Sequence, residues 1–206
     1  MAFKRHSPLE SNLRKQGIRF VAGVDEAGRG PLAGPVVAAA CLIPQGVKLQ
    51  GIQDSKKLSP EKREKLFERI CSEAYAYAVG IVSVEDIDQI NILQATKKAM
   101  REALSKLSIT PDYLLIDGNQ GINVAIPQKL IIKGDSASVS IGAASIIAKV
   151  TRDRLMASLE KDLPNFSFAR HKGYGTALHQ KEIEQFGITA YHRKSFAPIA
   201  LVLNKG

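Results

Sequence analysis

The sequence predicts a single α/β domain: a mixed sheet, antiparallel in its early strands, flanked by helices and followed by a small helical C-terminal section. Three observations favour this fold class. Short apolar runs of strand length alternate with longer segments of helical periodicity. No linker rich in Pro, Gly or Ser divides the 206 residues, and no repeat of roughly 20 to 50 residues is visible. We therefore expect one domain over residues 1–206, with a core at about 18–160 and a C-terminal section at about 161–206.

The first two strands are predicted from apolar runs at residues 18–25 and 35–43. A short glycine-rich connection joins them, which favours antiparallel neighbours because a parallel pair needs a longer crossover. A helix is expected to begin after Ser59, a serine N-cap followed by a proline and by an acid in the first turn. Residues 78–82 are predicted as a third strand, and residues 84–107 as largely helical.

In the second half of the chain, strands are predicted to alternate with helices. Residues 113–116 form an apolar run that leads into an Asp-Gly-Asn turn sequence at 117–119. Residues 130–132 form a shorter apolar run. The pattern is helical again from 138 to about 159, and the small residues in its first half predict close packing against a sheet. A last helix is expected at residues 178–186.

The net charge of +9 and the pI of about 9.6 suit a polyanionic partner, because lysine and arginine displace counterions from phosphates. Charge alone does not separate this reading from that of a generally basic protein. Cys41 and Cys71 are the only cysteines, and we interpret them as small core residues in a reducing compartment rather than as a disulfide. No secretory signal and no apolar stretch of roughly 18 residues is present, so we expect a cytoplasmic protein without a membrane span.

Acids follow three of the predicted strands: Asp25 with Glu26, then Asp117, then Asp135. Strand ends are where side chains from distant segments converge in an α/β sheet. Clustered carboxylates repel one another, so they either take up protons or hold hard cations, and oxygen ligands suit magnesium or manganese better than zinc. Taken singly, Asp117 could belong only to a turn and Asp135 could cap a helix near Ser136. The recurrence favours a metal site, which requires the strand to turn at Asp25 for both neighbouring acids to reach it.

The turn at Gly28-Arg29-Gly30 matches neither a dinucleotide fingerprint nor a P-loop, since the next glycine is Gly34 and Pro31 intervenes. One interpretation is a tight connection, because glycine adopts positive φ without steric cost. The other is a backbone that closely approaches a sugar-phosphate. Such a backbone can test for a 2′-hydroxyl, the group that distinguishes RNA from DNA.

The C-terminal section is rich in basic side chains, and three of the four histidines lie there. The histidine spacing does not resemble a zinc site, which leaves a supporting role or ordinary packing for His171, His179 and His192. We expect a phosphate-facing surface in this section, with an ordinary solvated face as the alternative. Its cations are Arg170, Lys172, Arg193 and Lys194.

Several sequence blocks, in order and spread over residues 18–198, resemble the bacterial type 2 ribonucleases H. The motifs include GVDEAGRGPLAGP, DSKKL, LIDGN, KGD, ASIIAKVTRD, HKGYGT and HRKSF, which occupy residues 23–35, 54–58, 115–119, 133–135, 144–153, 171–176 and 192–196. This resemblance implies an RNase H-like fold and a metal-dependent endonuclease. The implied substrates are the RNA strand of RNA–DNA hybrids and single ribonucleotides embedded in duplex DNA.

The resemblance also assigns roles to individual residues. It makes four carboxylates the catalytic metal ligands, namely Asp25, Glu26, Asp117 and Asp135. It places Gly28, Arg29 and Gly30 against the nucleotides that flank the scissile phosphate, Lys56 or Lys57 on phosphate, and Tyr174 on the sugar at the RNA–DNA junction. We count Arg193 among the substrate-binding residues because of its basic surroundings.

The implied mechanism uses two Mn²⁺ or Mg²⁺ ions, with water as the nucleophile and products that end in a 3′-hydroxyl and a 5′-phosphate. The alternatives are a hybrid-binding module without catalysis and another nuclease of the same superfamily. Type 3 relatives carry an extra N-terminal domain, for which the 17 residues before the first predicted strand leave no room. Residues 201–206 show no clamp-binding motif, and we expect a monomer with no obligate protein partner.

Overall fold

A computed structural model describes residues 8–52 and 58–204 of the chain. Its centre is a five-stranded sheet in the order β3-β2-β1-β4-β5. The β1–β2 and β2–β3 pairs are antiparallel, whereas the β1–β4 and β4–β5 pairs are parallel. The predicted mixed sheet with antiparallel early strands is therefore confirmed. The strands are β1 (Val21–Ala27), β2 (Val36–Leu42), β3 (Ala76–Val82), β4 (Tyr113–Asp117) and β5 (Gln128–Ile131).

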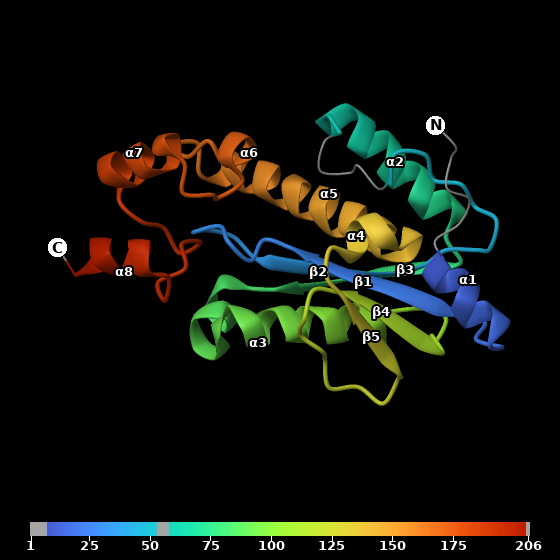
Figure 1. Ribbon diagram of the computed structural model, residues 1–206. Helices are drawn as coiled ribbons and strands as arrows, with labels where there is room; N and C mark the ends of the chain where they lie inside the picture. The colour runs from blue at the N-terminus through green and yellow to red at the C-terminus, as the bar shows by residue number, and fades with distance from the viewer. Residues whose placement is uncertain (1–7, 53–57, 205–206) are drawn as a thin grey trace.

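Helices cover both faces of the sheet (Figure 1). The α3 helix lies on one face, while α5 lies on the other with α2 beside it, and α6, α7 and α8 extend past one end of the sheet. Of the helices in the described residues, the sequence predicted α2, α3, α5 and α7 but not α1, α4, α6 or α8. The helices are α1 (Pro8–Lys15), α2 (Pro60–Glu73), α3 (Val84–Ser105), α4 (Gly134–Ala137), α5 (Val139–Asp162), α6 (Phe168–His171), α7 (Ala177–Phe186) and α8 (Ala197–Leu203).

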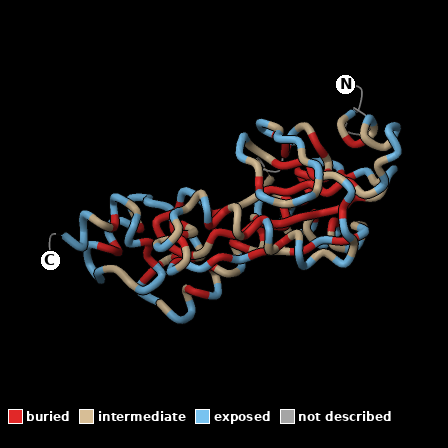
Figure 2. The backbone as a smooth tube through the Cα atoms, turned by 90° about the horizontal axis from the view of Figure 1, so that it is seen from below, coloured by how far each residue is buried: buried red, intermediate tan, exposed pale blue. Residues whose placement is uncertain are grey.

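Small residues let α5 and α3 lie directly on the sheet. A Cβ at Gly23 would come within 2.0 Å of the backbone of Ser140 in α5, and one at Gly80 within 2.0 Å of the carbonyl oxygen of Ala99 in α3. The predicted close packing of the 138–159 helix is confirmed, since its small residues are buried among those of β2. Figure 2 shows the buried backbone running along the sheet and continuing into the C-terminal section.

Local signals explain where the helices begin. The Ser59 hydroxyl accepts a hydrogen bond from the Lys62 N–H, as predicted for an N-cap. The long α3 helix is interrupted at Asn91, whose φ of 65° is left-handed. The Asn91 side chain accepts from the N–H groups of Leu93 and Gln94, so it restarts the helix in the same way as a cap.

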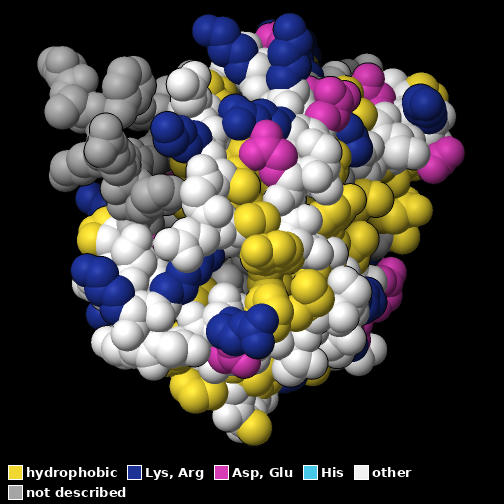
Figure 3. Space-filling view, turned by 90° about the vertical axis from the view of Figure 1, so that its right-hand side faces the viewer, with side chains coloured by type: hydrophobic (Ala, Val, Ile, Leu, Met, Phe, Trp, Pro, Cys, Tyr) yellow, Lys and Arg dark blue, Asp and Glu magenta, His cyan; other side chains and the backbone are white. Residues whose placement is uncertain are grey.

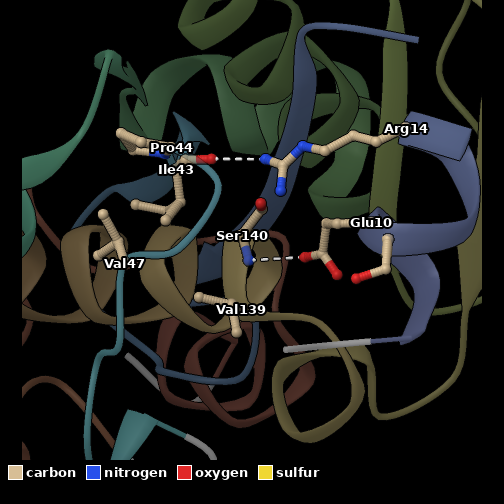
Figure 4. Close-up of a pocket in the computed structure, with 8 residues that line it drawn as sticks. Glu10, Arg14, Ile43, Pro44, Val47, Val139 and Ser140 are labelled. Carbon is tan, nitrogen blue, oxygen red and sulfur yellow. Dashed lines mark hydrogen bonds between the residues drawn. The ribbon is translucent and has the colours of Figure 1, made fainter. Parts of the chain in front are cut away.

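The α1 helix caps α5 through one buried acid (Figure 4). Glu10 Oε1 accepts hydrogen bonds from the Ser138 hydroxyl at 2.6 Å and from the Ser140 N–H at 3.0 Å. A carboxylate at this place satisfies an N–H of the first helical turn and favours the positive end of the helix dipole. Beside it lies a cavity of about 20 Å³, and among the described residues Glu10 Oε2 and Ser140 Oγ have no hydrogen-bond partner. This volume is sufficient for one water molecule.

The α1 end of the molecule is chemically mixed. Figure 3 shows a hydrophobic area there, with basic and acidic side chains around it. Over the described part of this face the cations lie in separate patches rather than in one continuous band (Figure 3). In the described part of the chain, no helix is long and apolar enough to cross a membrane, and Cys41 and Cys71 are free thiols.

The C-terminal section has a small hydrophobic core of its own, to which the end of α5 and the segment after β1 contribute. A β-bridge joins Ala33 to His192, and the Leu32 N–H donates to the carbonyl of Gly173. These contacts attach the C-terminal section to the segment that follows β1. The core residues are Leu32, Ala33, Met156, Leu159, Phe166, Phe168, Ile183 and Ile199.

Candidate active site

Three of the predicted acids lie at one edge of the sheet. Asp25 and Glu26 are near the end of β1, and Asp117 is the last residue of the adjacent parallel strand β4. Asp25 is only 5% exposed, whereas Glu26 and Asp117 are half-buried. The charge of Asp117 raises the pKa of both β1 acids. The strand does not turn at Asp25, since β1 stays paired with β2 as far as Ala27. The two neighbouring acids are therefore linked to Asp117 through their charges rather than by a bend of the strand.

The Asp25 carboxylate carries negative charge that its surroundings leave largely uncompensated. Burial raises its pKa well above the ordinary value, and the charges of Glu26 and Asp117 raise it further. Hydrogen bonds from Ser145 and from the Glu26 N–H, the latter at 2.7 Å, oppose this shift. A cation is the usual compensation for such a group. The donor set consists of oxygen atoms alone and fits a hard divalent cation such as Mg²⁺ or Mn²⁺.

Glu26 is held differently, because it has a cationic neighbour. Burial raises its pKa, Arg29 lowers it, and Asp117 raises it. Arg29 Nη1 lies 3.3 Å from Glu26 Oε1, and its side chain is about half exposed. The same arginine is thus both a partner of a site carboxylate and part of the turn that the sequence singled out.

The last predicted acid, Asp135, does not end a strand. Strand β5 ends at Ile131, Lys133 takes a left-handed φ of 57°, and Asp135 lies in the first turn of α4. The Gly134 N–H donates to Asp117 Oδ1 at 2.5 Å, which ties α4 to the end of β4. Asp135 is buried, and its Oδ1 accepts from the Ser136 N–H at 3.1 Å. The expectation of a strand end was therefore wrong, but the backbone still brings Asp135 next to Asp117.

The four carboxylates do not form a preformed metal-binding site in this structure. Within residues 8–52 and 58–204, no three Asp, Glu, His or Cys side chains are placed so that together they could hold a metal ion. The geometry thus unites Asp25, Glu26 and Asp117 electrostatically, and Asp135 by its neighbouring backbone. Binding of a cation by all four would require their side chains to rotate.

A cavity of about 390 Å³ opens beside Glu26. Its wall combines the backbone of the glycine-arginine turn, cationic side chains from α2 and α5, and one exposed tyrosine. Such a wall suits a sugar-phosphate better than an apolar ligand. The lining residues are Glu26, Ala27, Gly28, Arg29, Gly30, Arg63, Ser145, Ile146, Lys149 and Tyr174.

Five of the lining residues were not predicted as site residues, and three of the five carry polar side chains, namely Arg63, Ser145 and Lys149. Ser145 and Lys149 are one helical turn apart on α5, and Arg63 is in the first turns of α2. Lys149 Nζ lies 2.6 Å from Asp153 Oδ1, and Arg63 Nη1 lies 3.9 Å from Asp153 Oδ2. The four-residue spacing of Ser145 and Lys149 is the signal that could have placed them together. No local signal indicates that α2 brings Arg63 to the same cavity.

The turn and Tyr174 meet at this cavity. Among the described residues, Cε1 of Tyr174 is the one atom within 4 Å of a Cβ built on Gly30, at 3.8 Å. Tyr174 is 44% exposed, so its ring is accessible from outside. Gly28 has a φ of 96°, and a Cβ there would lie 2.1 Å from Nε of Arg152, so no other residue fits at this position. The structure thus brings the predicted turn and the predicted tyrosine together.

The structure does not place two of the expected substrate contacts, the lysines at 56 and 57 and Arg193, against the cavity in the described residues. Lys56 and Lys57 lie outside the described residues. Arg193 does not face phosphate: it is fully buried, and its guanidinium donates to the backbone carbonyls of Gly28, Arg29 and neighbouring residues. The expectation that Arg193 is a surface cation was wrong, because backbone carbonyl groups that need hydrogen-bond donors lie directly over its guanidinium group.

The three histidines are buried and form one network. His171 Nε2 lies 2.9 Å from Glu182 Oε2, His171 stacks on His179 with ring centroids 4.1 Å apart, and His179 Nε2 lies 3.1 Å from His192 Nε2. His179 Nδ1 is 3.0 Å from the carbonyl oxygen of Tyr174. Burial lowers the pKa of all three rings, and that of His192 falls to about 4. Their packing supports the loop that carries Tyr174.

A nuclease needs negative charge that can hold a cation next to a surface that accepts the sugar-phosphate chain, and this edge of the sheet provides both. The fold and the site therefore define an enzyme that hydrolyses phosphodiester bonds in nucleic acid. A family model described as Ribonuclease HII matches residues 22–199. The chain belongs to the ribonuclease HII family and is a ribonuclease H, an endonuclease.

Curated relatives support the family over nearly the whole chain. A ribonuclease HII of Geotalea uraniireducens is 58% identical over 188 residues, which cover 91% of this chain and 87% of that protein. A ribonuclease HII of Bacillus cereus is 53% identical over 203 residues, covering 98% of this chain and 79% of that protein.

Solved structures agree with the fold. The crystal structure of the ribonuclease H2 from Pyrococcus horikoshii is 30% identical, with a TM-score of 0.75 over 90% of this chain and 98% of that one. The ribonuclease HII of Archaeoglobus fulgidus, solved in a complex with PCNA, is 28% identical, with a TM-score of 0.71 over 84% and 93%. A Bst ribonuclease HIII solved with Mn²⁺ has a TM-score of 0.69 over 99% of this chain and 75% of that one, and at 18% identity it supports the fold alone. The predicted RNase H-like α/β fold is confirmed.

Proposed function

We propose that this ribonuclease H cuts the RNA strand of RNA–DNA hybrids and also single ribonucleotides embedded in duplex DNA, leaving 3′-hydroxyl and 5′-phosphate ends. One observation carries the proposal: Glu26, at the acidic edge of the sheet, lines a cavity whose wall includes residues 28–30 and Tyr174. A wall of bare backbone beside an exposed ring can test one sugar for its 2′-hydroxyl. A long stretch of hybrid is not required for such a test.

We propose that Asp25, Glu26, Asp117 and Asp135 hold Mg²⁺ or Mn²⁺, with two ions as the expected number. Divalent cations at such a site lower the pKa of a bound water and stabilise the charge that develops on the leaving oxygen. The residues themselves supply the negative charge that attracts the cations. Burial of Asp25 makes that charge costly without a partner, so cation binding relieves an existing repulsion.

The substrate contacts divide into those that position and those that select. Arg29 and Lys149, together with Lys56 or Lys57, would contact phosphates. The backbone of Gly28–Gly30 would face the sugar next to the scissile phosphate, and the Tyr174 ring would pack on the sugar at the RNA–DNA junction. Arg29 pairs with Glu26 in this structure, so its guanidinium would exchange one oxyanion for another when substrate binds.

The sequence alone also left open a hybrid-binding module without catalysis. It would need the basic surface but would gain nothing from Asp25, which is buried beside two further acids at a cost in stability. The observation therefore favours the enzyme. We expect the enzyme to act as a monomer, without an obligate protein partner.

The test offers the protein a DNA duplex that contains one ribonucleotide, a long RNA–DNA hybrid and an all-DNA duplex. We expect cleavage of the first two in Mn²⁺ or Mg²⁺, none of the third, and loss of all cleavage with chelator. A cut that leaves a 5′-phosphate and a 3′-hydroxyl at the ribonucleotide supports the proposal. Cleavage of long hybrids alone would contradict the single-ribonucleotide part, and cleavage in chelator would contradict the cation part.

A further inference from the structure

The carbonyl side of the glycine-arginine turn is held by one buried arginine. Arg193 donates from Nη1 to the carbonyl oxygen of Arg29 at 3.0 Å and from Nη2 to that of Gly28 at 2.6 Å. Its Nε and Nη2 also donate to the carbonyl oxygen of Gly34, at 3.0 and 2.8 Å, and Nη2 lies 3.3 Å from that of Pro35. One side chain thus binds both ends of the loop between β1 and β2.

The guanidinium is fixed as well as bonded. Arg193 is fully buried, and its Cζ lies 5.0 Å from the ring centroid of Phe196. Burial and the nearby Arg152 lower the pKa of Arg193 to about 9, so the group remains a cation at neutral pH while carbonyl dipoles and one ring surround it. Burying this charge is costly, and a role only in filling space would be met by an apolar residue at lower cost.

A second arginine extends the same support to the Tyr174 loop. Arg152 of α5 donates to the carbonyl oxygens of Ala33, Pro35 and Lys172, at 3.0, 2.9 and 3.0 Å. Lys172 lies two residues before Tyr174. The turn and the tyrosine, which come from distant parts of the sequence, are therefore fixed to one pair of buried guanidinium groups.

The opposite side of the turn is left open. In the part of the chain that the structure describes, no backbone hydrogen bond uses the N–H groups of Arg29 or Gly30, and both residues line the cavity. Because Arg193 engages the carbonyl oxygens of Gly28 and Arg29, the peptide groups of the turn are oriented by a contact on the side away from substrate.

We propose that Arg193 is a positioning residue for ribonucleotide recognition: it orients the Gly28–Gly30 backbone against the sugar without touching the substrate. The proposal rests on the proposed function of that turn. Lysine has one nitrogen in place of the planar fork, so it keeps the charge but cannot reach the carbonyls at both ends of the loop. The fork rather than the charge is therefore the property to test.

The test compares R193K with R154K. Arg154 is a matched control because its guanidinium also stacks on a phenylalanine, with Cζ 4.5 Å from the Phe67 centroid, but it is half exposed and pairs with Glu64. The readouts are kcat and KM on a duplex with one ribonucleotide and on a long hybrid, together with binding of an all-DNA duplex and the thermal midpoint of each variant.

We expect R193K to lower kcat/KM on the single-ribonucleotide duplex by about 10- to 100-fold, the loss that a displacement of about 1 Å at a reacting group produces. The loss on long hybrids should be smaller, binding of all-DNA duplex should be unchanged, and R154K should behave as wild type. Equal losses on both cleaved substrates, or none, would overturn the proposal.

If R193K unfolds below the assay temperature, F196L replaces it. This variant keeps apolar bulk but removes the ring over the guanidinium, and it should show the same selective loss at smaller size. An F196L enzyme with wild-type selectivity would overturn the proposal. Failure of the wild-type enzyme to cut the single-ribonucleotide duplex would instead overturn the proposed function, so the two failures are distinguishable.

Discussion

Replacing Asp117 by asparagine or by alanine separates two properties of this carboxylate. Its Oδ1 accepts the Gly134 N–H at 2.5 Å, and its charge raises the pKa of Asp25 and Glu26. Asparagine keeps an oxygen acceptor and removes the charge. Alanine removes both. D117N therefore keeps the hydrogen bond that ties α4 to β4, whereas D117A loses it. Both variants lose the charged oxygen that is proposed to bind the cation.

The two variants are expected to change the stability of the fold in different directions relative to the wild type. D117A leaves the N–H of the buried Gly134 without its acceptor, which costs about 1–3 kcal/mol. For a protein of this size this corresponds to a fall of roughly 2–12 °C in the thermal midpoint. D117N relieves the repulsion from Asp25 and Glu26, so its midpoint should equal or exceed that of the wild type. Both variants should lose at least about 10³-fold in kcat, equivalent to about 4 kcal/mol of transition-state stabilisation.

The assay pairs thermal unfolding in chelator with cleavage of a single-ribonucleotide duplex in Mn²⁺. A D117N enzyme that unfolds as early as D117A would refute the assignment of the Gly134 hydrogen bond. A D117N enzyme that retains more than about a tenth of wild-type kcat would refute the role of the charge in catalysis. The two readouts are independent, so each part of the reasoning can fail alone.

Three further predictions concern α1, the histidine network and Tyr174. E10A should lose about 2–4 kcal/mol of stability, because it orphans two buried donors, whereas E10Q keeps the accepting oxygen and should lose less than half as much in urea unfolding. Folding depresses the pKa of His192 to about 4, so the unfolded chain binds the proton first and stability falls as the pH drops from about 6.5 towards 4. H192N keeps an acceptor for the Thr189 N–H and removes the titrating ring, so its thermal midpoint should fall less steeply with decreasing pH than that of the wild type. An equally steep fall in H192N would contradict the assignment of the pH dependence to His192. Y174A should reduce cleavage of a single ribonucleotide more than cleavage of long hybrids. Y191A, which alters another exposed tyrosine, is the control. Equal losses on the two substrates would argue against sensing of the junction by Tyr174.

The strand-end acids could be predicted because their signal is local. Asp25 and Asp117 each follow a run of buried apolar residues, and the parallel pairing of β1 with β4 brings the two ends together. Asp135 follows a strand only loosely, since the left-handed Lys133 and the short α4 helix intervene. A tetrapeptide helix has no periodicity to detect, so this part of the site required the structure.

Arg193 shows where local reasoning fails. A cation in a basic segment is assigned to the surface by default, because burial of a charge is costly. The carbonyl groups that compensate Arg193 belong to Gly28, Arg29, Gly34 and Pro35, more than 150 residues away in sequence. The cavity residues Ser145 and Arg63 were not assigned to the site for a related reason, because they come from two helices, α5 and α2, that follow the turn at different separations in the sequence.

The central claim is that the carboxylates at this sheet edge hold the cations that the cleavage requires. Binding of Mn²⁺ to the protein without substrate tests it most directly, measured as the loss of the free-ion EPR signal in the wild type and in D25N, with E102Q on α3 as the control. We expect Mn²⁺ to bind saturably to the wild type and to E102Q, and to bind D25N at least about tenfold more weakly, equivalent to about 1.4 kcal/mol. Equal binding by all three proteins would contradict it.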